Sequence, residues 1–172
     1  MLSFAELLAE EEVPVKVVSS TSIKDIPYPQ ANSLDVVLQV IEALRPQGNS
    51  IYDLVGMGIV KSARQASYYY NAAEFLGFCF KRNDFYCPTE RVERILSIEG
   101  SARKSLFAAM VLSCQFVGRL YCGVFGYNGR EERLKWIESK MAHKITSKVT
   151  LRRRAECLLS WISWIQENLP KI

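Results

Sequence analysis

A chain of 172 residues is long enough for one domain or two small ones, and it can bury a core without disulfide bonds or a structural metal. Its 49% hydrophobic and 23% charged residues are typical of a globular protein and exclude a wholly disordered chain. The net charge of +4 permits an acidic partner such as nucleic acid without requiring one. This charge is polarised, because four glutamates lie within the first 12 residues and a basic block with Lys148 and residues 152–154 lies near the other end.

Targeting and metal-binding signals are weak throughout the sequence. The first 12 residues are acidic and lack the long apolar core of a secretory signal. The most apolar run, residues 107–125, is interrupted by Ser113, Gln115 and Arg119, so we expect a buried helix there rather than a membrane span. The five cysteines have no zinc-knuckle spacing, and His143 is the only histidine. We therefore expect a cytoplasmic protein with reduced thiols and with no metal, cofactor or membrane contact.

Residues 1–33 are expected to form an N-terminal arm. Four valines between positions 13 and 18 favour a short strand, because β-branched side chains suit a pleated backbone. Pro27 and Pro29 forbid a regular helix in the segment that follows. We expect this arm to run extended and to pack on the next part of the chain.

Residues 34–100 are expected to form a first folded module. Apolar side chains recur at helical spacing from Leu34 to Leu44, and serines at positions 50 and 62 are placed to cap a second and a third helix. Gly77 ends the third helix. Aromatic residues flank the polar segment 82–84, which predicts a β-hairpin, and Thr89 can cap another helix after it. Three short helices followed by a hairpin are the order of a winged-helix module.

Residues 101–172 are expected to form a second, helix-turn-helix-like module. An apolar stripe runs from Leu106 to Val117, and helices are predicted over about 130–143 and 148–168. A shift of about 89 positions aligns Arg64 with Arg153 and neighbouring alanines with each other, which indicates either a duplication or a chance match of two amphipathic helices. The predicted fold is mostly α with a small β-hairpin, built from tandem winged-helix or helix-turn-helix modules.

The third helix of each module carries residue types that bind DNA. In helix-turn-helix proteins the N-terminal residues of this helix reach base edges, where arginine can bind guanine and glutamine can bind adenine. The alternative for the arginines is an ordinary surface ion pair, such as one between Arg152 and Glu156. Of the three consecutive tyrosines 68–70, we expect Tyr69 to point inward. The candidate DNA contacts are Lys61, Ser62, Arg64, Gln65, Tyr68, Lys81, Arg82, Lys148, Thr150, Arg152 and Arg153.

No catalytic constellation is recognisable in the sequence. There is no glycine-rich phosphate loop and no identifiable pair of acid–base carboxylates. Residues 138–140 spell Glu-x-Lys, but the strand and the upstream aspartate of a nuclease motif are missing. We therefore expect no catalytic residue and no enzyme activity. Trp161 and Trp164, three positions apart, are expected to pack on the other module or on a partner chain.

Two stretches resemble winged-helix modules of prokaryotic restriction–modification and related DNA-binding proteins. Residues 64–77 resemble the pattern Arg-Gln-Ala-x-Tyr-Tyr-x-Asn-Ala-Ala-x-x-Leu-Gly, and residues 150–165 resemble Thr-x-x-Arg-Arg-Ala followed by Trp-Ile-x-Trp-Ile. The resemblance covers most of residues 26–168 and implies DNA binding, often beside a nuclease or other effector. The chain is too short to hold an additional nuclease domain, so an effector is expected on another chain or on a longer parent.

These observations lead to one expected function and one alternative. The expectation is a non-catalytic protein that binds double-stranded DNA in restriction–modification, defence or transcription control. The alternative is a protein–protein adaptor that uses its tryptophans and tyrosines to bind a partner, or to form a homodimer through the face of Trp161 and Trp164.

Overall fold

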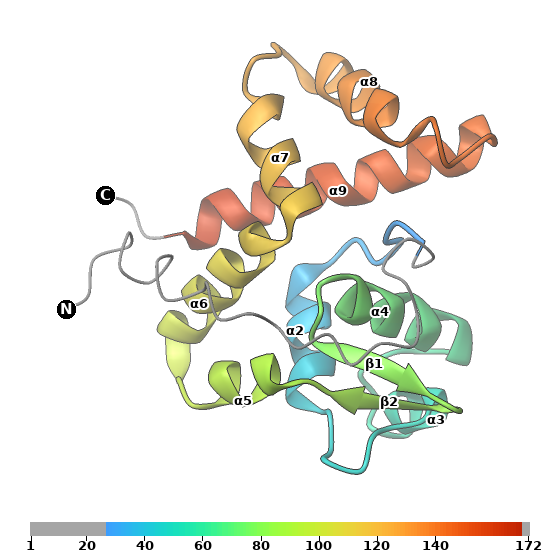
Figure 1. The fold of residues 1–172 in the computed structure, drawn as a ribbon, viewed down its shortest axis with the longest axis vertical. Coiled ribbons are helices and arrows are strands. Elements are labelled where there is room, and N and C mark those ends of the chain that lie inside the picture. The colour runs from blue at the N-terminus through green and yellow to red at the C-terminus, as the bar shows by residue number, and fades with distance from the viewer. Residues whose placement is uncertain (1–26, 170–172) are drawn as a thin grey trace.

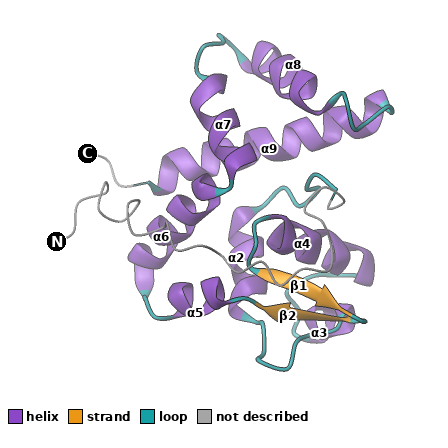
Figure 2. Cartoon of the chain, viewed as in Figure 1, coloured by secondary structure: helices purple, strands orange, loops and turns teal. Residues whose placement is uncertain are grey.

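The computed structural model describes residues 27–169, which form a mostly helical structure with one small antiparallel sheet (Figure 1, Figure 2). The mostly helical class and the small hairpin are therefore confirmed, whereas the strand expected in the N-terminal arm lies outside the described residues. In Figure 1, α7–α9 occupy the upper part and α2–α5 with the sheet occupy the lower part. The elements are α2 (Leu34–Glu42), α3 (Ile51–Gly56), α4 (Ala63–Phe75), β1 (Cys79–Arg82), β2 (Phe85–Pro88), α5 (Glu90–Leu96), α6 (Gly100–Ser113), α7 (Gln115–Val124), α8 (Arg130–Met141) and α9 (Lys148–Asn168).

Helix α4 contributes one large aromatic side chain to the core, and it is Tyr70. This side chain is fully buried and stacks on Tyr86 of the hairpin, with ring centroids 4.1 Å apart. Its hydroxyl donates a hydrogen bond to the carbonyl of Ser50. The prediction that Tyr69 is the inward residue was wrong, because the hairpin packs on the Tyr70 side of the helix and leaves Tyr69 half-buried near Cys157 of α9.

The hairpin turns one face to the core and the other to solvent. Cys79 and Tyr86 are buried, whereas Phe80 and Phe85 are 43% and 48% exposed. This alternation follows from the period of two along a strand. Tyr86 also forms an isolated bridge with Asn49, so the segment before α3 adds a third short strand position beside β2.

The apolar run 107–125 is not one helix, contrary to the prediction. It is divided between α6 and α7, which are bent by 95° at Cys114, where the backbone is extended. A Cβ atom on Gly118 would lie 2.6 Å from the carbonyl oxygen of Leu112, so the absence of a side chain there allows α7 to fold back on the end of α6. Among the described helices, none is by itself long and apolar enough to cross a membrane; α6 and α7 meet the requirement only as a bent pair, by length and composition.

Helix α9 is fixed to the first half of the chain by its two tryptophans. The indole of Trp161 is fully buried and donates a hydrogen bond of 2.7 Å to the carbonyl of Ala31. The indole of Trp164 donates a bond of 2.9 Å to Asp35, which also pairs with Lys104 of α6 at 2.7 Å. The tryptophans therefore pack within the chain, as the first of the two predicted arrangements has it, with Trp161 buried and Trp164 half-buried.

We expect Trp161→Phe to lower the free energy of unfolding by roughly 1–3 kcal/mol, because the substitution removes the indole donor to the carbonyl of Ala31 and leaves the weaker donor, the Cys157 thiol at 3.0 Å. Trp136→Phe is the matched control, since Trp136 lies half-exposed on α8. Urea unfolding followed by circular dichroism measures both variants. Equal losses in the two variants would contradict a special role for Trp161 in holding α9.

Candidate nucleic-acid interface

The first turn of α4 is built around a helix cap that uses two of the predicted contact residues. The hydroxyl of Ser62 accepts a hydrogen bond from the backbone N–H of Gln65, and the side-chain oxygen of Gln65 accepts one of 2.9 Å from the backbone N–H of Lys61. Such bonds satisfy donors that a helix start otherwise leaves free. The cap gives Ser62 a structural role at the start of α4. It leaves the amide nitrogen of Gln65 as an exposed donor that makes no hydrogen bond among residues 27–169.

In the same first turn of α4, Arg64 is held against Tyr68, which lies one turn further along the helix. The Nε of Arg64 donates a hydrogen bond of 2.7 Å to the Tyr68 hydroxyl, and its guanidinium lies 5.7 Å from the centroid of the tyrosine ring. The spacing of four residues places both side chains on one face of the helix. The arginine is exposed and the tyrosine is half-buried, so the pair stands at the surface with a preferred geometry.

Two arginines of α9 approach the same tyrosine. The pKa of Tyr68 lies below its usual value, first because Arg64 donates a hydrogen bond to the hydroxyl and then because the charges of Arg64 and Arg153 favour the phenolate. Arg154 lies within electrostatic reach of both Tyr68 and Arg153, and burial lowers its own pKa. We refer to Tyr68, Arg64, Arg153 and Arg154 as the Tyr68 cluster. Its members come from the two predicted third helices, which the sequence placed in separate modules.

The Tyr68 cluster holds positive charge without a counter-charge. The ion pairs within residues 27–169 involve other cations, and none reaches Arg64, Arg153 or Arg154. The Nε of Arg154 is buried and has no hydrogen-bond partner among these residues. Placing like charges together and leaving a buried donor unpaired both cost free energy. The arrangement therefore suits an anion that approaches from outside.

Arg152 is engaged elsewhere. Its guanidinium binds Glu131 with two hydrogen bonds, of 2.6 and 2.9 Å, and reaches Glu138 at 3.3 Å and Glu156 at 3.4 Å. Glu131 and then Glu138 raise the pKa of Arg152. The ion pair with Glu156 that the sequence offered as an alternative is present, and two acidic residues of α8 join it. A guanidinium with three carboxylates tethers α9 to α8 and has little capacity left for a phosphate.

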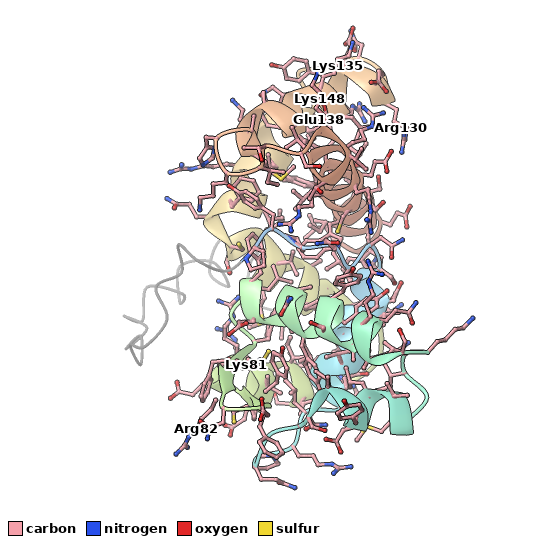
Figure 3. All side chains as sticks on the ribbon, turned by 90° about the vertical axis from the view of Figure 1, so that its right-hand side faces the viewer. Lys81, Arg82, Arg130, Lys135, Glu138 and Lys148 are labelled. Carbon is pink, nitrogen blue, oxygen red and sulfur yellow. The ribbon has the colours of Figure 1, made fainter. Side chains whose placement is uncertain are left out.

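Three of the remaining predicted contacts, Lys81, Arg82 and Lys148, are labelled in Figure 3. The view shows Lys81 and Arg82 of the hairpin in its lower part and Lys148 of α9 in its upper part, with α4 at a height between them. Lys81 is also held through its backbone N–H, which donates to Glu74 at 3.1 Å. Thr150 is half-buried in the first turn of α9, where its backbone N–H donates to the capping hydroxyl of Ser147. The hairpin tip and Lys61 carry positive charge at the surface, whereas the half-buried Thr150 has little side-chain surface available to a ligand.

Arg154 is the member of the cluster that sequence reasoning missed as a candidate contact. In the sequence, Arg154 was distinguished only by its place in a run of three arginines. Its neighbour in the cluster, Tyr68, lies 86 positions away in the sequence. A pairing over that separation leaves no mark in local periodicity.

Among residues 27–169, we identify no metal site or catalytic group at this surface. Among residues 27–169, no group of three or more histidine, cysteine, aspartate or glutamate side chains is placed to hold a metal ion. Burial raises the pKa of the Cys157 thiol to about 12, and that of Cys79 well above its usual value. Thiols of this kind stay protonated at neutral pH and are poor nucleophiles. The arrangement can bind an anion but offers no evident acid, base or nucleophile beside it.

Comparison with known proteins gives a family without a described activity. A family model described as "Domain of unknown function (DUF7226)" matches residues 37–169. The match extends from within α2 to the end of α9 and includes the Tyr68 cluster. No curated protein and no solved structure matches the chain.

We expect the Tyr68 phenol to ionise below pH 10, its ordinary value, because neighbouring arginines favour the phenolate. The difference in tyrosinate absorbance between the wild type and Tyr68→Phe isolates this titration. Arg64→Ala should move the pKa up towards the ordinary value, and Arg153→Ala should move it in the same direction by less. An unchanged titration in both variants would mean that these arginines do not face the hydroxyl.

We expect Arg152→Ala to lower the thermal unfolding midpoint by a few degrees, because it removes the partner of three carboxylates. Since Arg152 lowers the pKa of Glu131 below 4.5, this contribution is present above pH 4.5 and is lost as the pH falls through the lowered pKa. Arg153→Ala is the control, because the neighbouring arginine has no carboxylate partner among the described residues. Calorimetry at pH 7 and pH 3 measures the unfolding midpoints of both variants. A difference between their midpoints that persists at pH 3 would rule out the ion pairs as its cause.

Proposed function

The chain belongs to the family described as Domain of unknown function (DUF7226), and we propose that it is a non-catalytic protein that binds double-stranded DNA. The observation that carries the proposal is the Tyr68 cluster, in which three arginines without carboxylate partners among the described residues surround one tyrosine. Phosphate groups provide the dominant attraction in protein–DNA binding, and arginine is well suited to bind them. Lys61, which precedes the first turn of α4, and Lys81 and Arg82 of the hairpin add exposed positive charge.

The order of elements supports a winged-helix arrangement of the first half. The helices α2, α3 and α4 are followed by the β1–β2 hairpin, and the bridge between Asn49 and Tyr86 supplies the short third strand. In this arrangement α4 is the recognition helix and the hairpin is the wing. Helices α8 and α9 form a second helix-turn-helix pair, with no hairpin after α9 in the part of the chain described here.

Base reading falls to Gln65 in this proposal. The side chain is exposed in the first turn of α4, and its cap engages the oxygen while the amide nitrogen stays available. A glutamine amide at this position of a recognition helix can contact adenine in the major groove. The hairpin lysine and arginine then take backbone phosphates beside it.

The biological setting follows from the resemblance of residues 64–77 and 150–165 to prokaryotic restriction–modification modules. It supports a cytoplasmic recognition protein in restriction–modification, defence or transcription control, with any nuclease or other effector supplied by a separate polypeptide or by a longer parent chain. Nothing at the Tyr68 cluster calls for a cofactor.

We expect the purified chain to bind a fluorescently labelled random-sequence duplex, with an affinity that falls steeply between about 50 and 200 mM salt, because phosphate contacts release counterions. Gln65→Glu should cost roughly 1–3 kcal/mol against the duplex preferred by the wild type. This variant keeps an oxygen that can accept from Lys61, so the helix cap survives while the amide donor is lost. Fluorescence anisotropy measures both effects.

Arg94→Ala is the matched control for charge. Arg94 lies on α5, on the left of Figure 1 and away from the side that Figure 3 faces. It should leave the affinity and its salt dependence unchanged. Absence of wild-type binding at 50 mM salt would overturn the proposed function.

A specific observation supports the adaptor as a second candidate. The outer face of the hairpin exposes Phe80 and Phe85, and Tyr52 of α3 is 70% exposed. Exposed aromatic side chains of this kind are common at protein interfaces. A chain that fails to bind DNA, but whose binding to a purified protein partner is lost in Phe85→Ser, would favour this candidate.

A further inference from the structure

We propose that the Tyr68 cluster is a clamp for a single phosphate group of the DNA backbone, which makes α9 a phosphate-binding helix and not a second base-reading helix. This inference rests on the DNA binding proposed above. It specifies which part of the DNA the second half of the chain contacts and which residues of the two halves share that contact.

The geometry of the tyrosine hydroxyl supports a shared phosphate. Arg64 donates a hydrogen bond of 2.7 Å to this oxygen, and the charge of Arg153 also acts on the Tyr68 side chain. The rings of Phe75 and Trp161, which lie seven residues beyond Tyr68 and Arg154, have centroids 6.5 Å apart. Helices α4 and α9 therefore pack together here, and guanidinium groups from both can reach the oxygens of one phosphate. The hydroxyl proton of Tyr68 is not used in any hydrogen bond made among residues 27–169, and it can be donated to the same anion.

Arg154 provides the second line of evidence. It is half-buried beside the cluster, and its Nε has no hydrogen-bond partner in the described part of the chain. Burying a charge without a partner is costly, and burial correspondingly lowers the pKa of this arginine. An anion bound at the cluster would offset this cost by adding an opposite charge to three guanidinium groups.

The other polar residues near the start of α9 do not compete for the clamp role. Arg152 is occupied by Glu131, Glu138 and Glu156. Thr150 is half-buried. With these two side chains unavailable, the exposed Lys148 and Arg153 are the predicted α9 contacts that remain, and two cations suit phosphate contacts better than the reading of a row of base edges.

The position of the clamp is fixed before DNA arrives. Trp161 and Trp164 are hydrogen-bonded to Ala31 and Asp35, so the α9 side chains cannot move independently of the first half without breaking these bonds. A preformed arrangement avoids the cost of ordering two parts of the chain on binding. We therefore expect a single rigid footprint that both halves share.

The test counts phosphates with the full chain, a labelled random-sequence duplex and the variants Arg64→Ala, Arg153→Ala and their double. Each phosphate neutralised by a protein contributes about 0.9 to the slope of log affinity against log salt. A shared phosphate predicts that the double variant loses about 0.9 of slope and that each single variant loses less, because either exposed arginine still neutralises the group, whereas the half-buried Arg154 acts on it by charge without a direct contact. Arg153→Ala should also weaken preferred and random duplexes by the same factor.

The outcomes separate the clamp from DNA binding itself. A loss of about 1.8 in the double variant, with about 0.9 in each single variant, would mean two separate phosphates and would overturn the clamp. An unchanged slope in the double variant, with wild-type binding intact, would also overturn it and leave the proposed function standing. No wild-type binding would overturn both. Circular dichroism of each variant, with Arg94→Ala as the charge control, confirms that the folded chain is compared throughout.

Discussion

The docking of α9 on the first half of the chain is the constraint on which the rest of the structure depends. Trp161 and Trp164 anchor the C-terminal half of a 21-residue helix to Ala31 and Asp35. A helix repeats every 3.6 residues, so this anchor also fixes the direction of every side chain in its N-terminal half. Arg154 lies seven residues before Trp161, nearly two full turns, and it must therefore face the first half as well.

The same periodicity assigns different environments to three consecutive arginines. Successive residues are turned by about 100°, so Arg152 points about 200° away from Arg154 and meets the carboxylates of α8. Arg153 lies between these directions and emerges beside Tyr68. One short basic run thus supplies a tether between two helices, an exposed cation and a half-buried cation. The net positive charge of residues 152–154 does not predict these three different environments.

Tyrosines 68 and 70 divide the two faces of α4 in a similar way. Tyr70 stacks on Tyr86 and helps to hold the hairpin, whereas Tyr68 organises arginines at the surface. The helix that joins the core to the hairpin is therefore also the helix that presents the cation cluster. Its first turn combines both roles again, since Ser62 and Gln65 cap the helix while the Gln65 amide remains exposed. Because residues of α4 serve both the fold and the surface, this short helix can carry most of the proposed contacts.

The sequence by itself determined most of the helices and the hairpin, because caps, glycines and apolar periodicity are local signals; Ser62 caps α4 as predicted. It also predicted Arg64, Gln65 and Arg153 as DNA contacts, and these stay predictions. Only the tertiary structure decided that Arg152 is a tether, that Arg154 joins Tyr68, that Tyr70 and not Tyr69 is buried, and that the chain bends at Cys114. Each of these depends on which element packs against a given face, and a contact between residues more than 80 positions apart leaves no trace in local spacing.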